Sequence, residues 1–401
     1  MERKQVPVGE LKFGMYIAEL DRPWTDTPFM FQGFHLRTDQ QLEVLKKFCK
    51  HVFVDLEKTE VEDRSRQRME APSFKIRGNT VYPETVNVET EVKRAAPVYT
   101  QTVKAVDELL RPLFKGATVL EGKEVKESVA RLTDSVVRNP DALLLVSKLR
   151  EKSEAAHARA LQVSIYMIVF GRFLDLAREE LELLGLLGLL QDVGKTQLPA
   201  SIMEKAGPLT PEQAEIAKKH VNLSAEILSE TPGLPPRLPA LALLHHERQD
   251  GSGYPRGLKG EQIGLYGSIA AIADTFDALT AVRPYAEPLT PSSALSYLYK
   301  ERGAGYHAEL VEQFIQCIGA FPVGSVVELN SGEVGIVIAQ NLVRRLKPRV
   351  MVVLDAQGNP MRPHKILDLE KDPKVRPEEP YKIRRTMEQS KLQVDPRELF
   401  L

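Results

Sequence analysis

The period of the hydrophobic pattern changes twice along the chain, and this feature limits the fold more than any other. Between about residues 99 and 320, apolar residues recur at i, i+3 and i+4, the spacing of one face of an amphipathic helix. Residues 1–58 and 321–369 instead carry short alternating stretches separated by turn residues, as β-strands do. The pattern predicts a multidomain protein in which an all-α domain lies between a small N-terminal β-rich domain and a small C-terminal β-barrel or meander.

Two further segments show neither period. Residues 59–98 are rich in charge, Thr, Glu and Pro, which predicts a solvated linker with at most a short strand near Val81. Residues 370–401 have mixed charge and several prolines, which predicts a loosely ordered tail.

Composition excludes several classes of protein. The 401 residues include 54 Lys+Arg and 55 Asp+Glu, so the net charge of −1 gives no basic surface for a nucleic-acid polymer. The 2 cysteines cannot form a disulfide framework, which indicates a reducing compartment. The N-terminal MERKQVPVGE lacks the apolar core of a signal peptide, and no apolar stretch is long enough for membrane insertion. We therefore expect a soluble, cytoplasmic protein.

The helical region concentrates residues that bind metals. Asp and His supply the carboxylate and imidazole ligands that Mn, Fe, Zn or Mg accept, and paired ions bridged by a carboxylate are a recurring solution for phosphoester hydrolysis. A single His on a helix is more often structural, and we interpret the other four of the 8 histidines in this way. Six such residues near helix ends in one region predict a metal site: His157, Asp192, His220, His245, His246 and Asp274.

A glycine-rich polar loop, HHERQDGSGYPRGLKGEQI, covers residues 245–263. Loops of this kind can bring backbone N–H groups to an anionic ligand, and Tyr254 offers a stacking face for a base. Lys195 and Arg283 are the cations whose sequence positions best suit contact with a phosphate.

These motifs together resemble the HD-GYP domain, a subgroup of HD-superfamily metal phosphohydrolases that hydrolyses the bacterial second messenger cyclic di-GMP. The resemblance covers residues 150–320 and depends on His157, DVGK at 192–195, EKAGPLTPEQ at 204–213, His220, the loop 245–263 and ADTFDALTAVRPY at 273–285. Residues 5–58 resemble an accessory domain that often precedes HD-GYP domains, and the β segment after residue 321 resembles their C-terminal appendage.

The resemblance also implies roles for particular residues. Asp192 would bridge two divalent ions, Mn or Fe, held by the six ligands named above. Asp192 and Lys195 would serve catalysis, and Arg283 would contact the scissile phosphate. Gly253, Tyr254 and Pro255 would shape the nucleotide pocket. The implied reaction is attack by a metal-bridging hydroxide on one phosphodiester bond, giving linear pGpG and, after a second cut, GMP.

The sequence departs from the family pattern at five positions. Gln191 replaces the His of the HD pair and would be a weaker, harder ligand than imidazole. Ser153 stands where members with three metals have Glu, so we expect a binuclear site. Ala286 replaces a basic residue, Ser268 an Arg and His307 an Asp. Together these changes predict weakened metal loading and a weakened grip on phosphate.

Three functions follow from this combination of matches and departures. The leading hypothesis is a cyclic di-GMP phosphodiesterase with weakened activity. The alternative is a catalytically retired HD-GYP protein that acts as a cyclic di-GMP receptor or binds GGDEF-domain or other signalling proteins. A third hypothesis is an HD hydrolase that acts on another nucleotide. The absence of a Gly-x-Ser-x-Gly elbow, a Walker loop and a Cys-x-x-Cys pair removes support for serine hydrolases, P-loop NTPases and thiol redox enzymes.

Overall fold

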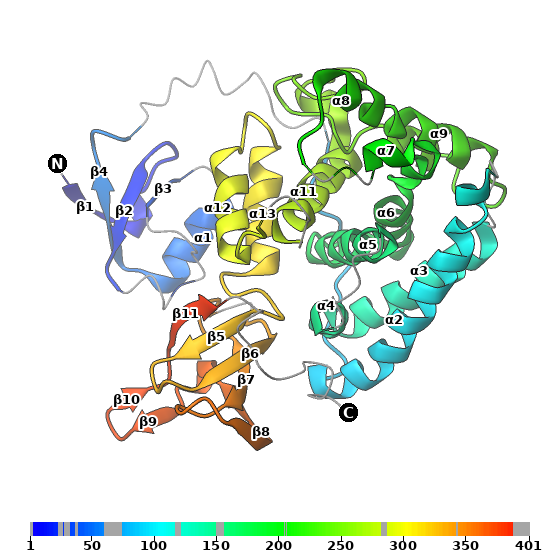
Figure 1. Ribbon diagram of the computed structural model, residues 1–401. Coiled ribbons are helices and arrows are strands. Elements are labelled where there is room, and N and C mark those ends of the chain that lie inside the picture. The colour runs from blue at the N-terminus through cyan, green and yellow to red at the C-terminus, as the bar shows by residue number, and fades with distance from the viewer. Residues whose placement is uncertain are drawn as a thin grey trace.

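A computed structural model gives the fold of this protein. It describes residues 3–22, 27, 33–36, 39–59, 74–116, 122–149, 156–203, 205, 207–281, 287–341 and 344–387. Along the chain a helical domain lies between two units built on β-sheets, as the hydrophobic pattern predicts. In space both sheet units lie on the same side of the helical domain (Figure 1). Its helices are α2 (Val88–Leu110), α3 (Gly122–Arg138), α4 (Pro140–Leu149), α5 (Ala156–Phe173), α6 (Arg178–Leu190), α7 (Ala200–Met203), α8 (Pro211–Lys218), α9 (His220–Glu230), α10 (Leu238–Ala242), α11 (Gly264–Thr280), α12 (Pro291–Lys300) and α13 (Ala308–Ile318).

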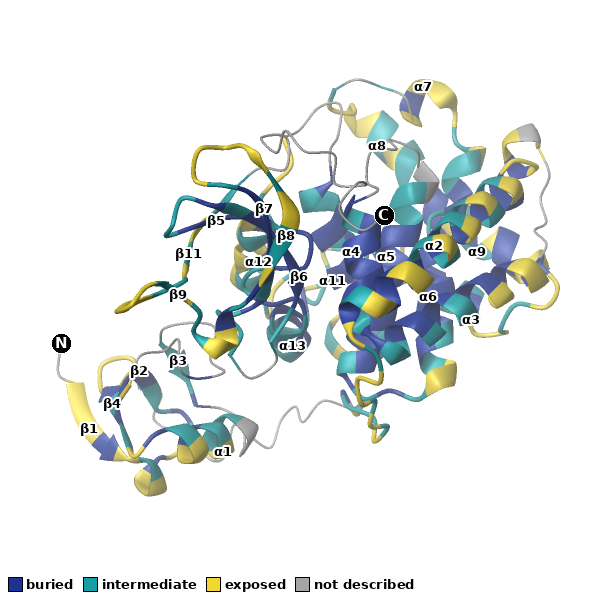
Figure 2. Ribbon diagram, turned by 90° about the horizontal axis from the view of Figure 1, so that it is seen from below, coloured by how far each residue is buried: buried dark blue, intermediate teal, exposed yellow. Residues whose placement is uncertain are grey.

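Helices α5 and α6 form the centre of this domain, and their described residues are mostly buried (Figure 2). They run antiparallel at close range because glycines of α6 face α5. A Cβ atom on Gly188 would lie 2.7 Å from the Cα of Ser164, and one on Gly185 would lie 2.8 Å from the Cδ1 of Ile168. This packing fixes the C-terminal end of α6, where Asp192 follows.

Helix α2 begins earlier than the sequence predicted. It starts at Val88, inside the expected linker 59–98, and continues through Pro97. The side chain of Asn87 caps it by accepting a hydrogen bond from the backbone N–H of Thr90 at 2.9 Å. The charged residues of this segment suggested that it is solvated, but not all of them face solvent. Glu91 is fully buried, and its carboxylate accepts a hydrogen bond from Arg138 at 2.7 Å.

The N-terminal unit is a four-stranded antiparallel sheet with one helix, α1 (Asp39–Phe48). The strand order is β1-β4-β2-β3, and β4 lies between β1 and β2. Ile17, Leu36, Leu45 and Val52 form its own small core. The strands are β1 (Arg3–Pro7), β2 (Tyr16–Leu20), β3 (Phe34–His35) and β4 (His51–Asp55).

The C-terminal unit is a five-stranded antiparallel sheet of order β11-β5-β6-β7-β8, beside a small β9–β10 ribbon. The expectation of a loosely ordered tail from residue 370 was wrong for residues 374–387, because β11 pairs along β5. Arg384 and Arg385 of β11 form ion pairs with Glu328 of β5, so this mixed charge is matched across strands. The strands are β5 (Val326–Leu329), β6 (Val334–Ala339), β7 (Arg349–Leu354), β8 (Pro360–Asp368), β9 (Lys374–Arg376), β10 (Glu379–Pro380) and β11 (Ile383–Met387).

One buried carboxyl group joins this sheet unit to the helical domain. Asp141, near the start of α4, is 7% exposed and accepts a hydrogen bond from the backbone N–H of Gln340, just after β6, at 2.9 Å. A second link pairs Arg349 of β7 with Glu89 of α2. Among the described residues, no helix is both long and apolar enough to cross a membrane.

Candidate active site

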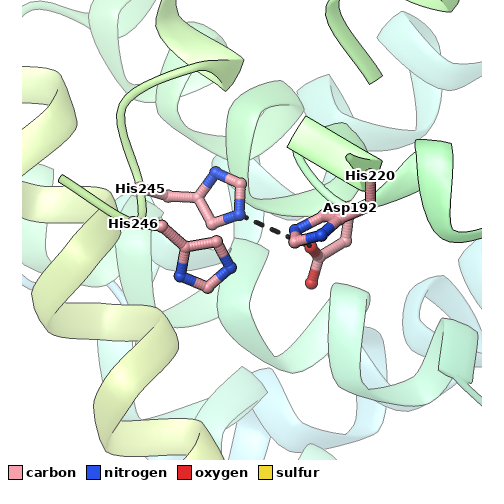
Figure 3. Close-up of side chains that lie close together, drawn as sticks. All are labelled: Asp192, His220, His245 and His246. Atoms are coloured by element: carbon pink, nitrogen blue, oxygen red, sulfur yellow. Dashed lines mark ion pairs between the residues drawn. The ribbon is translucent and has the colours of Figure 1, made fainter. Parts of the chain in front are cut away.

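Four of the six predicted ligands meet at one point of the helical domain. Asp192, His220, His245 and His246 each place one ligand atom so that all four atoms lie within 4.8 Å of one another (Figure 3). Asp192 follows α6, His220 begins α9, and the two adjacent histidines follow α10. Residues far apart in the sequence therefore converge where three helices end or begin.

The hydrogen bonds of two imidazoles prepare them as ligands. The Nδ1 atoms of His220 and His245 lie 2.6 Å and 2.8 Å from the backbone carbonyl oxygens of Ala217 and Ala242. Because a carbonyl oxygen can only accept, Nδ1 carries the proton, and in the neutral ring Nε2 presents a lone pair. These Nε2 atoms lie 3.1 Å and 3.5 Å from Oδ1 of Asp192.

The three converging atoms have no hydrogen-bond partner among the described residues. Nε2 of His220, Nε2 of His245 and Oδ1 of Asp192 are all buried. Buried polar atoms are normally satisfied, and two imidazole lone pairs facing a carboxylate oxygen repel one another unless a cation lies between them. The donor set thus fits a divalent metal ion.

Lys195 keeps Asp192 charged. Burial alone would raise the pKa of Asp192, but the Lys195 ammonium beside it holds the pKa well below its ordinary value. Nζ of Lys195 donates to the second oxygen, Oδ2, at 2.6 Å, which leaves Oδ1 for the cluster. Burial lowers the pKa of His246, so at neutral pH this imidazole is uncharged and can bind a metal ion through a ring nitrogen.

The turn after Asp192 is pressed against α9. The backbone N–H of Gly194, in the 3-10 helix η4 (Val193–Gln197), donates to Oγ of Ser224 at 2.8 Å. A Cβ atom on Gly194 would collide with the carbonyl oxygen of His220. Glycine at this position therefore allows the close approach that brings His220 to Asp192.

Glu247 organises the glycine-rich loop, a role that the sequence reasoning did not assign. Its carboxylate is 1% exposed and accepts backbone hydrogen bonds from Arg256 at 2.8 Å and Leu258 at 2.9 Å. The chain thus folds around this carboxylate. An acidic residue next to two histidines and ahead of four glycines was the signal that could have revealed it.

Gly253 and Tyr254 pack against the segment of the loop that carries His246. A Cβ atom on Gly253 would lie 2.5 Å from the Cα of Glu247, so only glycine fits. The ring of Tyr254 stacks on His246 with centroids 4.6 Å apart and planes 27° apart. Nζ of Lys218 lies 5.5 Å from the Tyr254 centroid. Two of the three predicted pocket residues therefore lie beside the predicted ligand His246, and Pro255 is the next residue in the chain.

The remaining predicted residues divide into two groups. Asp274, on α11, is 8% exposed and lies outside the 4.8 Å cluster, with Nη2 of Arg159 at 3.8 Å from its Oδ1. His157 belongs to α5, but its side chain lies outside the described residues, as do Arg283 and Ser153.

Two of the five positions that depart from the family pattern have a buried polar atom without a hydrogen-bond partner among the described residues. Gln191 is 1% exposed, and its Oε1 has no hydrogen-bond partner within the described parts of the chain. The same holds for Oγ of Ser268 on α11. His307 caps α13, where its ring accepts from the backbone N–H of Leu310 at 3.4 Å. Ala286 lies outside the described residues.

Comparison with known families covers the three units of the chain. Residues 144–310 match the HD domain, residues 3–120 match a domain of unknown function (DUF3391), and residues 326–376 match a KOW domain associated with the HD domain.

Curated relatives are similar over different lengths. The chain is 30% identical to a cyclic di-GMP phosphodiesterase of Pseudomonas aeruginosa over 369 residues, 91% of this chain and 89% of that protein. It is 42% identical to the cyclic di-GMP phosphodiesterase response regulator RpfG of Xanthomonas campestris over 144 residues, 36% of this chain and 38% of RpfG. It is 35% identical to a 3'3'-cGAMP-specific phosphodiesterase of Vibrio cholerae over 173 residues, 43% of this chain and 33% of that protein.

The helical fold, the match to the HD domain and a cluster of residues that could hold a metal ion define an HD-type phosphohydrolase domain. The chain belongs to the HD-GYP-type family of cyclic di-GMP phosphodiesterases, with a DUF3391 domain before the HD domain and a KOW domain after it. This confirms both the family resemblance and the predicted fold class.

Proposed function

We propose that this protein hydrolyses cyclic di-GMP to pGpG and GMP in a metal-dependent reaction. The observation that carries the proposal is the convergence of buried, unpartnered ligand atoms from Asp192, His220 and His245. Similarity to a cyclic di-GMP phosphodiesterase over 91% of the chain supports the same activity. The proposal includes a cytoplasmic location and a binuclear site, with Mn or Fe as the ions.

Divalent ions held by these residues would supply an activated water and brace the negative charge that develops on the phosphoryl group. The protein's own residues orient this chemistry. Lys195 fixes Oδ2 of Asp192, so Oδ1 keeps its direction toward the imidazoles. Tyr254, stacked on His246, offers a ring face next to the cluster on which a guanine could lie. His157 and Asp274 would complete the ligand set, and Arg283 would bind the scissile phosphate.

Gln191 supports the weakened activity that we include in the proposal. It directly precedes Asp192, and its amide oxygen binds a borderline metal less well than an imidazole does. Replacement of groups that only support ligands typically costs about 10–100-fold in metal affinity or activity, so loss of a ligand imidazole should cost at least as much. Gln191→His is therefore expected to raise both metal content and turnover.

The decisive experiment measures metal content and product formation in the same preparations. Wild type and Asp192→Ala would be loaded anaerobically with Mn²⁺ or Fe²⁺ and incubated with cyclic di-GMP, and products would be separated by chromatography. We expect turnover by wild type and loss of both metal and turnover in Asp192→Ala. Asp134→Ala removes a carboxylate that pairs with Arg178 on the surface, and it should leave both quantities unchanged. A metal-loaded wild type that leaves cyclic di-GMP intact would contradict the proposal.

A catalytically retired receptor is the second candidate, favoured by the buried and unpartnered Oε1 of Gln191. It predicts calorimetric binding of cyclic di-GMP, or capture of GGDEF-domain partners, without turnover. Silence in wild type with turnover in Gln191→His would support this candidate. Hydrolysis of 3'3'-cGAMP in preference to cyclic di-GMP would instead support the third hypothesis, an HD hydrolase with another nucleotide substrate.

A further inference from the structure

We infer that Arg159 is a fixed cation built into the metal centre beside Asp274, and that it weakens the binding of a second divalent ion on the Asp274 side. The inference rests on the proposed metal dependence, and it assigns a role to an arginine that the predicted ligand set does not include. The sequence gives no sign of this role, because Arg159 lies on α5 while both of its acidic neighbours lie on α11.

Asp277 anchors the guanidinium. Nε of Arg159 donates to Oδ2 of Asp277 at 3.0 Å, and Asp277 is fully buried. A charge-assisted hydrogen bond to a buried carboxylate holds a side chain in one position, because its loss would leave an uncompensated charge. Arg159 itself is partly exposed, with 36% of its side-chain surface accessible.

Anchored in this way, the guanidinium lies beside the predicted ligand. Asp274 and Asp277 are three residues apart on α11 and so share one face of the helix. Nη2 of Arg159 is 3.8 Å from Oδ1 of Asp274, which is an ion pair but is too long for a hydrogen bond. Asp274 therefore keeps its lone pairs while it lies in the field of a neighbouring positive charge.

The charge of Asp192, inside the four-residue cluster, also acts on Arg159. Burial alone would lower the pKa of Arg159, but the charges of Asp277, Asp274 and Asp192 raise it. Burial raises the pKa of Tyr254, and Asp192 and Asp274 raise it further. The charges of Asp192, inside the cluster, and of Asp274, outside it, thus raise the pKa values of both Arg159 and Tyr254.

Asp192 and Asp274 consequently differ in how well their surroundings favour the binding of a divalent ion. Asp192 meets its Lys195 partner through one oxygen and presents the other oxygen to two imidazoles. Asp274 also has a cation beside it, the Arg159 guanidinium, which keeps its charge throughout the physiological pH range, but Asp274 lies outside the cluster of imidazoles that would offset the repulsion of a bound ion. We expect one tightly bound ion and a second ion bound at least about tenfold more weakly.

Calorimetric titration of the full-length, metal-free protein with Mn²⁺ tests this inference without using activity. Wild type should bind one ion tightly and a second weakly. Arg159→Gln should tighten the second ion about tenfold or more, because the repulsion is removed. Arg178→Gln is the matched control: Arg178 also pairs with two carboxylates, Asp134 and Glu182, but on the surface, and its loss should not change either binding constant.

Circular dichroism would verify that each variant is folded. Since Arg159→Gln leaves the buried Asp277 without its cation, Asp277→Asn provides a second test. It releases Arg159 from its anchor toward Asp274 and should weaken the second ion. Equal affinities for two ions in wild type, or an unchanged or weaker second ion in folded Arg159→Gln, would overturn the inference, as would a tighter second ion in Asp277→Asn. Failure of wild type to bind any Mn²⁺ would instead overturn the proposed metal-dependent function.

Discussion

Asp192 and Asp141 belong to the same helical domain, yet the pKa values of their carboxyl groups shift in opposite directions. Burial raises the pKa of Asp141 to about 7, because Arg172, Arg349 and the backbone N–H of Gln340 only partly offset it and Glu84 adds to it. At Asp192, burial is outweighed by the Lys195 ammonium, and the pKa falls well below its ordinary value. Immediate neighbours, more than depth of burial, decide which carboxyl group carries charge at neutral pH.

The difference in charge between Asp192 and Asp141 suits the two carboxyl groups to different roles. A charged Asp192 with a free oxygen can bind a metal ion, whereas Asp141 accepts a single backbone hydrogen bond between α4 and the end of β6. The same isosteric substitution, Asp to Asn, should therefore impair the chemistry at one site and alter only the stability at the other.

The largest expected effect is that of Asp192→Asn. The amide keeps the shape of the side chain but removes the charge that Lys195 and a metal ion both require. We expect loss of bound metal and a fall in cyclic di-GMP hydrolysis of more than about 100-fold, since even supporting groups of metal ligands are worth about 10–100-fold. Metal analysis and chromatography of the products measure both quantities. Retention of metal in a folded Asp192→Asn variant would show that the negative charge of Asp192 is not required for metal binding.

Gln191→His should have the opposite effect to Asp192→Asn, because it strengthens the set of metal ligands next to Asp192. It changes no charge near Asp141. An increase of about tenfold in metal affinity and turnover is expected. Equilibrium dialysis against Mn²⁺ and the hydrolysis assay would measure it. If neither quantity changes, the weakness lies instead at Ala286, Ser268 or Ser153.

Glu247 adds a third buried carboxylate, satisfied by backbone N–H groups rather than by a cation. Glu247→Gln turns an amide N–H toward one of these donors, so a hydrogen bond becomes a clash. We expect a loss of about 1–3 kcal/mol in the free energy of unfolding, together with weaker binding of cyclic di-GMP. Urea denaturation and calorimetry would measure these changes. Glu230→Gln, an exposed substitution at the end of α9, is the control and should change neither.

Asp141→Asn should have the smallest effect, a change in how the free energy of unfolding depends on pH. The folded state of wild type holds the Asp141 proton up to about pH 7, while the unfolded chain releases it near the ordinary value of 3.8. The unfolded state therefore binds fewer protons between these pH values, and this group's contribution to stability declines as pH rises through that window. Asp141→Asn should flatten the decline, as measured by denaturation between pH 4 and pH 8. An unchanged profile would show that Asp141 is ionised in the folded protein.

Much of the architecture and part of the site could be predicted from the sequence, because those signals are local. Helical periodicity, strand alternation and turn residues depend on neighbours a few positions away, and they gave the helical domain and its two β-rich flanks correctly. The start of α2 at Val88 was missed because Glu91 looks solvated until Arg138 lies against it. The pairing of β11 with β5 was missed for a similar reason, since the charges of Arg384 and Arg385 are matched only across the sheet.

By itself the sequence determined which residues could bind a metal: the histidines, the Asp in DVGK and the glycines that permit tight turns. Only the tertiary structure decided which of them meet, and in what state. It places Oδ1 of Asp192 against two imidazole Nε2 atoms, and it leaves Asp274 outside that cluster with Arg159 beside it. The physical reason is that ligand geometry and pKa depend on distances between groups carried by different helices, and those distances are set by packing.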